Sequence, residues 1–337
     1  MIYGERIIQA RELRGLKQDE LAEKVGVSQS AIARIENGTL IPSAELLKSI
    51  SNETGFLNSF FEQEPIEFPS GTLNFRSNLL SSKEETKVYQ YAKLFYEQAR
   101  EMAKELRLPP NRLSQLDDED PVKAAAVVRA SLGLSPDMPI KNLVKTIEKN
   151  GIIVFLLPLM LPKLDAFSTW VELDCNRPAI AITLGRPTDR LRFSIAHEIG
   201  HLVLHRKIKG TVRTAEQAAD AFAASFLLPE SSMRRDLVEP ISLTSVARLK
   251  PKWGVSMQAL VYRARELGII TERQYRYLFQ QISARGWKKD EPDNLDLQPE
   301  KPELIRKMAE ALFNDVGQYA NSMNLREDTA MELFLFL

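Results

Sequence analysis

The sequence is poor in the residues from which proteins most often build metal and disulfide sites. Among its 337 residues there is one cysteine, Cys175, and there are three histidines. A single cysteine excludes an internal disulfide and any zinc site that needs several cysteines, and it is typical of a reducing compartment. All three histidines lie in one stretch, HEIGHLVLH at 197–205, so any chemistry that histidine supports is concentrated there.

Net charge and long apolar segments are lacking too. The 45 basic side chains balance the 45 acidic ones, so no global field favours nucleic acid or a membrane. The most apolar run, IIVFLLPLML at 152–161, is too short to span a bilayer and contains Pro158, which indicates a buried strand and its exit. The N-terminus carries charges where a signal peptide needs an apolar run. We therefore expect a cytoplasmic protein without membrane contact.

Helical patterns dominate the chain and predict a mainly α protein with a small β-sheet, an α+β fold. The sheet is expected from the β-branched and aromatic segments IIVFLL, AFSTWVEL and PAIAIT. Ser28 and Ser43 are expected N-caps, and Ser82 with Glu85 forms a capping box that opens a long helix to about Leu106. The other helices are expected at 4–13, 17–24, 28–35, 43–50, 121–131, 139–149, 188–206, 215–227, 243–249, 256–267, 272–284, 302–322 and 326–336.

The segment QDELAEKVGVSQSAIARIENG predicts two helices joined at Gly26, where a positive φ costs a glycine little. Ala22 is small enough for the two helices to cross closely. An apolar seam runs between the helices and consists of Leu21, Val27, Ile32 and Ile35. These features together predict a helix-turn-helix whose second helix turns its other face outward.

That outward face could bind DNA. Glutamine and arginine side chains can bind adenine and guanine edges in the major groove, and nearby amides can bind phosphates. The segment resembles the Xre/Cro-type repressor domain over residues 5–60. Its weak charge indicates modest affinity per protomer, so we expect a homodimer on a palindromic, double-stranded operator. Acidic residues slightly outnumber basic ones in 1–60, so a helical interaction module that never touches DNA is the alternative. The expected face carries Gln29, Ser30, Ala33 and Arg34, with Gln18 and Asn37 as phosphate contacts.

The HEIGHLVLH stretch has the spacing of a metal-binding helix. His197 and His201 are four residues apart and lie on one helical face, where two imidazoles can bind one ion. Glu198 is placed to act as general base toward a metal-bound water. His205 lies about 12 Å along the helix axis from His197, too far to bind the same ion, so we expect a helix-end residue or one that orients a ligand. A structural helix with buried histidines is the alternative.

A catalytic zinc normally has three protein ligands, so a third must come from another element. The segment TAEQAADAFAASFLLP at 214–229, with a capping box at Thr214 and Gln217, predicts a helix on which Glu216 and Asp220 face the same way. Packed antiparallel on the first helix, it could place Glu216 on the metal and Asp220 on a ligand imidazole, as in a gluzincin-type site. Alternatively, the two carboxylates lie on a solvated face. The segment's many alanines would permit close packing of the two helices.

The run FSTW…RPAIAIT…DRLRFSIAHEIGHLVLH…EQAADAFAASFLLP resembles the ImmA/IrrE family of zinc-dependent endopeptidases, which are often fused to Xre-type domains. The likeness extends through WGVSMQALVYRARELGII and covers about residues 65–295. It implies one catalytic Zn²⁺ ion held by His197, His201 and Glu216, with Glu198 as general base. Many family members have a second glutamate two residues after position 216, where this chain has Ala218.

The resemblance divides the chain into a helix-turn-helix domain (1–62), a linker and long connecting helix (63–110), a zincin-like metallopeptidase domain (111–290) and a helical tail (291–337). One hypothesis is a DNA-binding regulator whose peptidase cleaves a repressor or regulatory partner. The other is an Xre-type repressor or antitoxin whose peptidase-like domain is a sensor or dimerisation module. Tyr262 or Arg263 is a candidate to stabilise the oxyanion. The apolar end of the tail, AMELFLFL, is expected to pack on the peptidase domain or a dimer mate.

Overall fold

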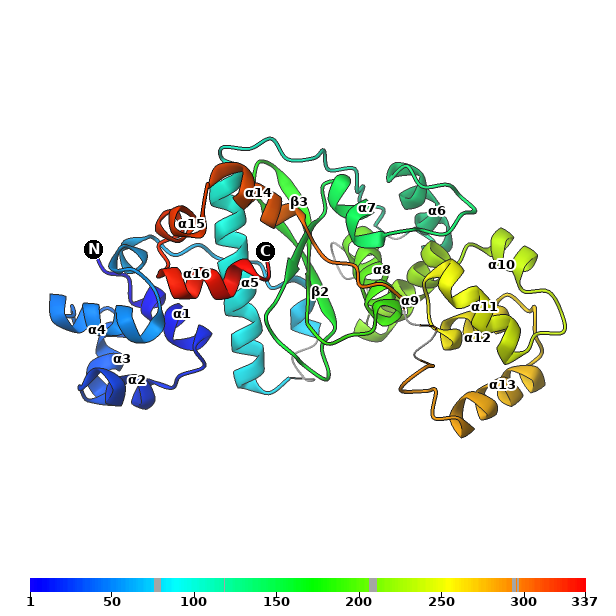
Figure 1. Ribbon diagram of the computed structural model, residues 1–337, viewed down its shortest axis with the longest axis horizontal. Coiled ribbons are helices and arrows are strands. Elements are labelled where there is room, and N and C mark those ends of the chain that lie inside the picture. Colours follow the sequence, from blue (N-terminus) through cyan, green and yellow to red (C-terminus); the bar gives the residue numbers. More distant parts are fainter. Residues whose placement is uncertain (76–79, 118, 206–210, 293–294, 296) are drawn as a thin grey trace.

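The chain folds into an elongated molecule with a helical domain at each end and a small sheet between them (Figure 1). The computed structural model describes residues 1–75, 80–117, 119–205, 211–292, 295 and 297–337. The N-terminal helices lie at one end, and helices α10 to α13 lie at the other. The predicted α+β fold, mainly helical with one small sheet, is confirmed.

The N-terminal helices begin where the sequence places their caps. The side chains of Ser28 and Ser43 accept hydrogen bonds from the first turns of α3 and α4. Gly26 ends α2 with a φ of 73°, so the turn between α2 and α3 needs a residue that tolerates the left-handed region. The elements here are α1 (Gly4–Leu13), α2 (Gln18–Val25), α3 (Gln29–Glu36), α4 (Ala44–Thr54) and the short 3₁₀ helix η1 (Asn58–Glu62).

The long helix α5 (Ser82–Ala103) separates the N-terminal domain from the sheet (Figure 1). Its capping box uses Ser81 and Glu84, one residue earlier than Ser82 and Glu85, because Ser81 is the serine with extended backbone. A second 3₁₀ helix, η2 (Gly71–Phe75), precedes α5 and lies against the sheet.

The sheet has three strands in the order β1-β3-β2. Strand β1 (Ile153–Leu156) runs parallel to β3 (Asn176–Ile182), and β2 (Ala166–Glu172) runs antiparallel to β3, with Ser168 opposite Ile180. Alternate residues point to opposite faces, so Phe155 and Phe167 join the core shared with α5 and the N-terminal helices. Ala166 and Ile180 join the core under α8 and α9. The sheet therefore divides two cores and leaves β2 at an edge.

The helices that cover the second core mostly match the predicted ranges. Helix α7 starts at 143 rather than 139, because Asn142 caps it. Helix α9 starts at 212, because Thr211 and Thr214 form its capping box instead of Thr214 and Gln217. The predicted end of α8 at 206 lies outside the described residues, and α10 was not predicted. These helices are α6 (Pro121–Ser131), α7 (Leu143–Lys149), α8 (Thr188–Leu204), α9 (Val212–Leu227), α10 (Glu230–Asp236), α11 (Leu243–Trp253), α12 (Met257–Glu266) and α13 (Glu272–Ala284).

The C-terminal segment returns to the opposite end of the molecule (Figure 1). The predicted helix 302–322 is two helices, α14 (Leu304–Leu312) and α15 (Val316–Ser322), because Asp315 caps a new one, and α16 (Glu327–Phe334) follows. Helix α14 contacts α5 and β1, and the backbone amide of Arg326 donates to the Gly55 carbonyl at 3.0 Å. The tail thus packs on the N-terminal domain as well, which the sequence did not predict. No helix among the described residues is long and apolar enough to cross a membrane.

Candidate metal centre

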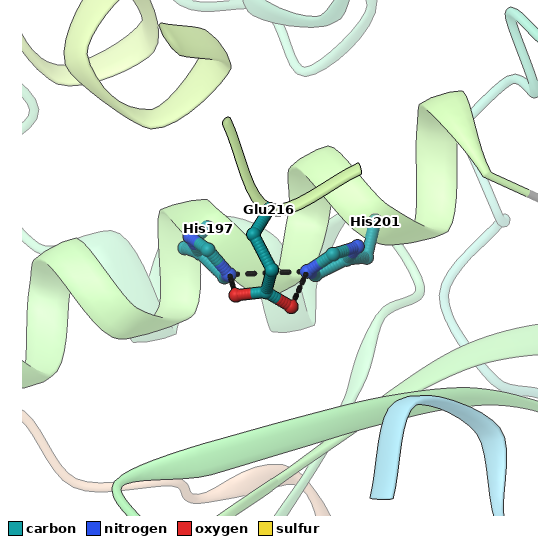
Figure 2. A group of neighbouring side chains, drawn as sticks. All are labelled: His197, His201 and Glu216. Atoms are coloured by element: carbon teal, nitrogen blue, oxygen red, sulfur yellow. Dashed lines mark hydrogen bonds and ion pairs between the residues drawn. The ribbon is translucent and has the colours of Figure 1, made fainter. Parts of the chain in front are cut away.

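Helices α8 and α9 bring two histidines and one carboxylate together (Figure 2). The Nε2 atoms of His197 and His201 lie 3.0 Å apart on one face of α8. From α9, the carboxylate of Glu216 reaches both rings, with oxygen–nitrogen distances of 3.3 Å to His197 and 3.2 Å to His201. Within the described part of the chain, this trio is the group of potential ligands whose donor atoms all lie within 4.8 Å of one another.

The outer nitrogens of both rings are engaged. The Nδ1 atom of His197 lies 2.8 Å from Oδ1 of Asp220, and Nδ1 of His201 lies 3.2 Å from Nδ1 of His205. Because a carboxylate can only accept, Nδ1 of His197 carries a proton, and Nε2, which faces Glu216, is the atom that would bind a metal in place of its own proton. Two imidazole nitrogens and one carboxylate are ligands that zinc accepts, so the residues present fit such an ion.

The same contacts shift the pKa values of His197 and Glu216. Burial lowers the pKa of His197, but its hydrogen bonds with Asp220 and Glu216 outweigh burial and raise that pKa to about 9. Hydrogen bonds from His197 and His201 hold the pKa of Glu216 well below its usual range. Glu216 therefore stays ionised and pairs with a protonated His197, and a bound metal ion would take the place of that proton.

His205 lies at the end of α8, as expected for a helix-end residue. Helix α8 stops at Leu204, and His205 is its C-cap. Burial, together with the neighbouring His201, lowers the pKa of His205 to about 4, so its ring is neutral at pH 7. It contacts one ligand ring but is not part of the trio.

Glu198 is fully buried and faces the sheet. Its Oε2 accepts a hydrogen bond from the Ser168 hydroxyl at 2.7 Å and another from the Thr72 hydroxyl at 2.9 Å. Neither hydroxyl is among the site residues predicted from the sequence. Ser168 could have been found from its place in the FSTW strand, whereas Thr72 lies in a stretch that carries no periodic signal.

A close approach of α8 and α9 allows the trio to form. A methyl group added at Gly200 would lie 3.1 Å from Cα of Ala219 and 3.2 Å from the Phe222 ring, tighter than ordinary packing. Gly200 lies between His197 and His201 in α8, directly before the second histidine. The small pair Gly200 and Ala219 therefore sets the depth at which Glu216 meets the histidines.

The structure argues against one of the two candidates for stabilising an oxyanion. The guanidinium of Arg263 is buried and donates to the Leu228 carbonyl at 3.0 Å and to the Ser225 hydroxyl at 3.2 Å. Its donors are thus used inside the fold. Arg263 and the half-exposed Tyr262 both line a cavity of about 1010 Å³ that reaches Asp220.

The predicted DNA-contacting residues lie on α2, α3 and the turn after it. Gln29, Ser30 and Arg34 are exposed on α3. The side-chain amide of Gln29 donates to the Gln18 side chain at 2.7 Å, so these two residues share one surface. Asn37 is the C-cap of α3, and its side-chain oxygen accepts from the Thr39 amide at 3.0 Å.

Two regions of the chain match models of known protein families. Residues 147–265 match the model of the IrrE N-terminal-like domain of peptidase family M78, and residues 7–56 match the helix-turn-helix model. No curated protein matches the chain significantly. The crystal structure of Bacillus thuringiensis PlcR in complex with the peptide PapR7 and DNA aligns over 85% of this chain and 97% of that chain, at 14% identity and a TM-score of 0.18. A TM-score this low carries no inference about fold or function.

The two matched ranges coincide with the two motifs. The helix-turn-helix match spans α1 to α4, and the other match spans the sheet, the histidine-bearing α8 and the carboxylate-bearing α9. The chain therefore joins an N-terminal helix-turn-helix domain to an IrrE N-terminal-like domain of the M78 peptidases, the fused architecture that its motifs predict.

Proposed function

We propose that the chain is a DNA-binding regulator whose M78 domain is a zinc-dependent endopeptidase that cleaves a repressor or another regulatory protein. The observation that carries this proposal is the convergence of His197, His201 and Glu216, with Glu198 one residue from the first ligand. A zinc ion bound there supplies Lewis-acid chemistry, since it polarises a carbonyl oxygen and lowers the pKa of a water molecule.

The protein's own residues have distinct roles in this proposal. Glu198 is the general base, which takes a proton from the attacking water and delivers it to the leaving amine. Its burial keeps bulk water from competing for that proton. Asp220 holds the His197 ring in the tautomer and orientation that point Nε2 toward Glu216.

The test of this function begins with elemental analysis for bound zinc in the full-length chain. Wild type and Glu198→Gln are then compared for cleavage of regulatory proteins encoded nearby, with Glu327→Gln as a matched control at an exposed position of α16. We expect about one zinc per chain in all three and cleavage that only Glu198→Gln abolishes. Cleavage that survives in Glu198→Gln would refute the assigned role of this residue.

The second candidate function is a repressor or antitoxin whose M78 domain is a sensor or dimerisation module with little turnover. The contact between Thr72 and Glu198 favours this second function, because the Thr72 hydroxyl is hydrogen-bonded to the carboxylate that would act as general base. Full zinc content without cleavage of any candidate protein is the outcome expected for such a sensor.

DNA binding rests on the exposed face of α3. The double variant Gln29→Ala with Arg34→Ala should lose operator-specific retardation in a gel-shift assay, because both side chains are exposed on α3 and are of types that bind base edges. Lys48→Ala removes one exposed positive charge from α4 and is the control, which should retain specific binding. A homodimer on a palindromic site is expected, and its half-site spacing is about one helical turn of DNA. Unchanged retardation by the double variant would exclude this face.

A further inference from the structure

Residues 63–75, which run from the end of η1 to the end of η2, are held by side chains of α1 and α5, and we call them the connector. The guanidinium of Arg6 in α1 donates to the carbonyls of Gln63 at 3.2 Å and Glu64 at 2.8 Å. The Tyr89 hydroxyl of α5 then donates to the carbonyl of Phe68 at 3.1 Å. Hydrogen bonds from α1 and α5 thus hold the connector as it runs from the helix-turn-helix domain to the sheet.

At its far end the connector covers the free edge of β2. Strand β2 pairs with β3 on one side only, so backbone groups on its other side are open to a partner. The Ser168 amide donates to the Thr72 hydroxyl at 2.8 Å, and the Ser168 carbonyl lies 3.3 Å from the same oxygen. These are the groups that an extended peptide would pair with if it were added to this edge.

The same threonine also reaches the proposed catalytic machinery. The buried Thr72 hydroxyl donates to Oε2 of Glu198 at 2.9 Å, although the two residues are 126 positions apart in the chain. The Thr72 hydroxyl is therefore hydrogen-bonded both to the backbone at the edge of β2 and to the carboxylate of the proposed general base. Any peptide that lies along β2 with its scissile bond near Glu198 must displace it.

The fit of the connector on β2 is close. A methyl group added at Gly71 would lie 2.1 Å from the Ser168 carbonyl oxygen and 2.5 Å from Cβ of Thr169. Only glycine allows the chain to pass at this distance, and its φ of 55° adds a second reason for glycine. Residues Gly71–Phe75 form a 3₁₀ helix rather than an extended strand, so they block the edge without presenting a peptide in the conformation of a substrate.

We propose that residues 70–75 of the connector are an intramolecular plug, which holds the peptidase site closed by covering the edge of β2 and by engaging Glu198 through Thr72. The substrate is then an extended, unfolded segment of protein that pairs with β2 after the plug leaves. This inference rests on the proposed peptidase function and adds its regulation. Since Arg6 ties the connector to α1, movement of the helix-turn-helix domain is a means of drawing the plug away.

Two variants loosen the plug in different ways. Gly71→Ala forces the connector off β2 by steric clash, and Thr72→Val removes the hydroxyl while keeping the side-chain shape. Gly133→Ala is the matched control, because Gly133 has a φ of 68° but no atom within 4 Å of the added methyl group. All are made in the full-length, zinc-supplemented chain.

Hydrogen–deuterium exchange of the Ser168 amide reports whether the plug is seated, independently of activity. We expect about five- to tenfold faster exchange in both plug variants, which is what the loss of one ordinary hydrogen bond gives, and no change in Gly133→Ala. Fluorescein-labelled β-casein, an unfolded protein, is the substrate probe. Its anisotropy rises on binding and falls on cleavage.

The proposal expects both plug variants to bind or cleave β-casein at least about fivefold better than wild type. It is overturned if exchange at Ser168 stays unchanged, because the plug is then not seated there. It is also overturned if exchange rises while binding and cleavage fall or stay level, because Thr72 then supports Glu198 instead of blocking it. Tighter binding without cleavage in any chain upholds the plug and refutes the peptidase function.

Discussion

Asp220 and His197 form the contact that orients the candidate metal centre. The Oδ1 atom of Asp220 lies 2.8 Å from Nδ1 of His197, while Glu216, one turn earlier on α9, faces the opposite nitrogen of the same ring. One helix thus holds a ligand ring from both sides. This arrangement ties the position of α9 to the geometry of both histidines on α8.

Removing this contact should weaken zinc binding without abolishing it. For Asp220→Ala we expect about a tenfold loss of zinc affinity, because carboxylates behind ligand imidazoles contribute about 10- to 100-fold and this one is 61% exposed. Competition with a chromogenic chelator measures the affinity. Glu230→Ala, which removes an exposed carboxylate from α10, is the control and should bind zinc as wild type does. Equal affinities in all three proteins would exclude the orienting role of Asp220.

Glu216 should be the ligand despite the alanine at 218. Glu216→Ala is expected to lose stoichiometric zinc, since two imidazoles alone leave the ion short of protein ligands. Adding Ala218→Glu to that variant should not restore zinc. Position 218 lies about 200° around the helix from 216, and Ala218 packs against the core under α8 and α9. Metal content after dialysis measures both variants, and recovery of zinc in the double variant would move the ligand to 218.

The close approach of α8 and α9 should make Gly200 intolerant of larger side chains. Gly200→Val is expected to lower the free energy of unfolding by about 1–3 kcal/mol, because the added carbons meet the backbone of Ala219 and the Phe222 ring. Urea denaturation followed by circular dichroism measures the loss. Ala126→Val, on the exposed face of α6, is the control for β-branching in a helix. It should lower the free energy of unfolding by only a few tenths of a kcal/mol. A loss at Gly200 no larger than the control would show that α8 and α9 are not tightly packed there.

Stability should fall as the pH rises from about 4.5 to about 7 because of Glu148 in α7. Burial raises the pKa of Glu148 from 4.5 to about 7, although backbone hydrogen bonds from Leu304 and Glu303 oppose the rise. The folded state therefore holds this proton more tightly than the unfolded chain does. Its stabilising effect is complete below about pH 4.5 and is lost progressively up to about pH 7.

Glu148→Gln removes this titration while keeping an oxygen that can accept from the first turn of α14. We expect the midpoint of thermal unfolding to depend less steeply on pH between 5 and 7.5 than in wild type, roughly over the window of the shift. Glu119→Gln, an exposed glutamate before α6, is the control and should keep the wild-type slope. An unchanged slope in Glu148→Gln would assign the pH dependence to other groups.

The N-terminal helices were predictable from the sequence because their signals are local. Ser28 and Ser43 cap helices within three residues of themselves, and the positive φ of Gly26 follows from its place in a two-helix turn. The starts of α5 and α9 were less predictable. Each start has more than one hydroxyl residue, and the backbone conformation of the folded chain makes Ser81 and Thr211 the caps.

The candidate metal centre likewise has some features that the sequence predicts and others that only the fold determines. The spacing of His197 and His201 by itself determines that their rings share a face, because α-helix geometry repeats nearly every four residues. The pairing of Glu216 with Asp220 could also be predicted from that repeat. Only the tertiary structure decides that Gly200 meets Ala219, that the tail returns to the N-terminal domain, and that Thr72 reaches Glu198. These contacts join residues far apart in the chain, and a hydroxyl in an aperiodic stretch carries no local signal of the partner that the folded core brings to it.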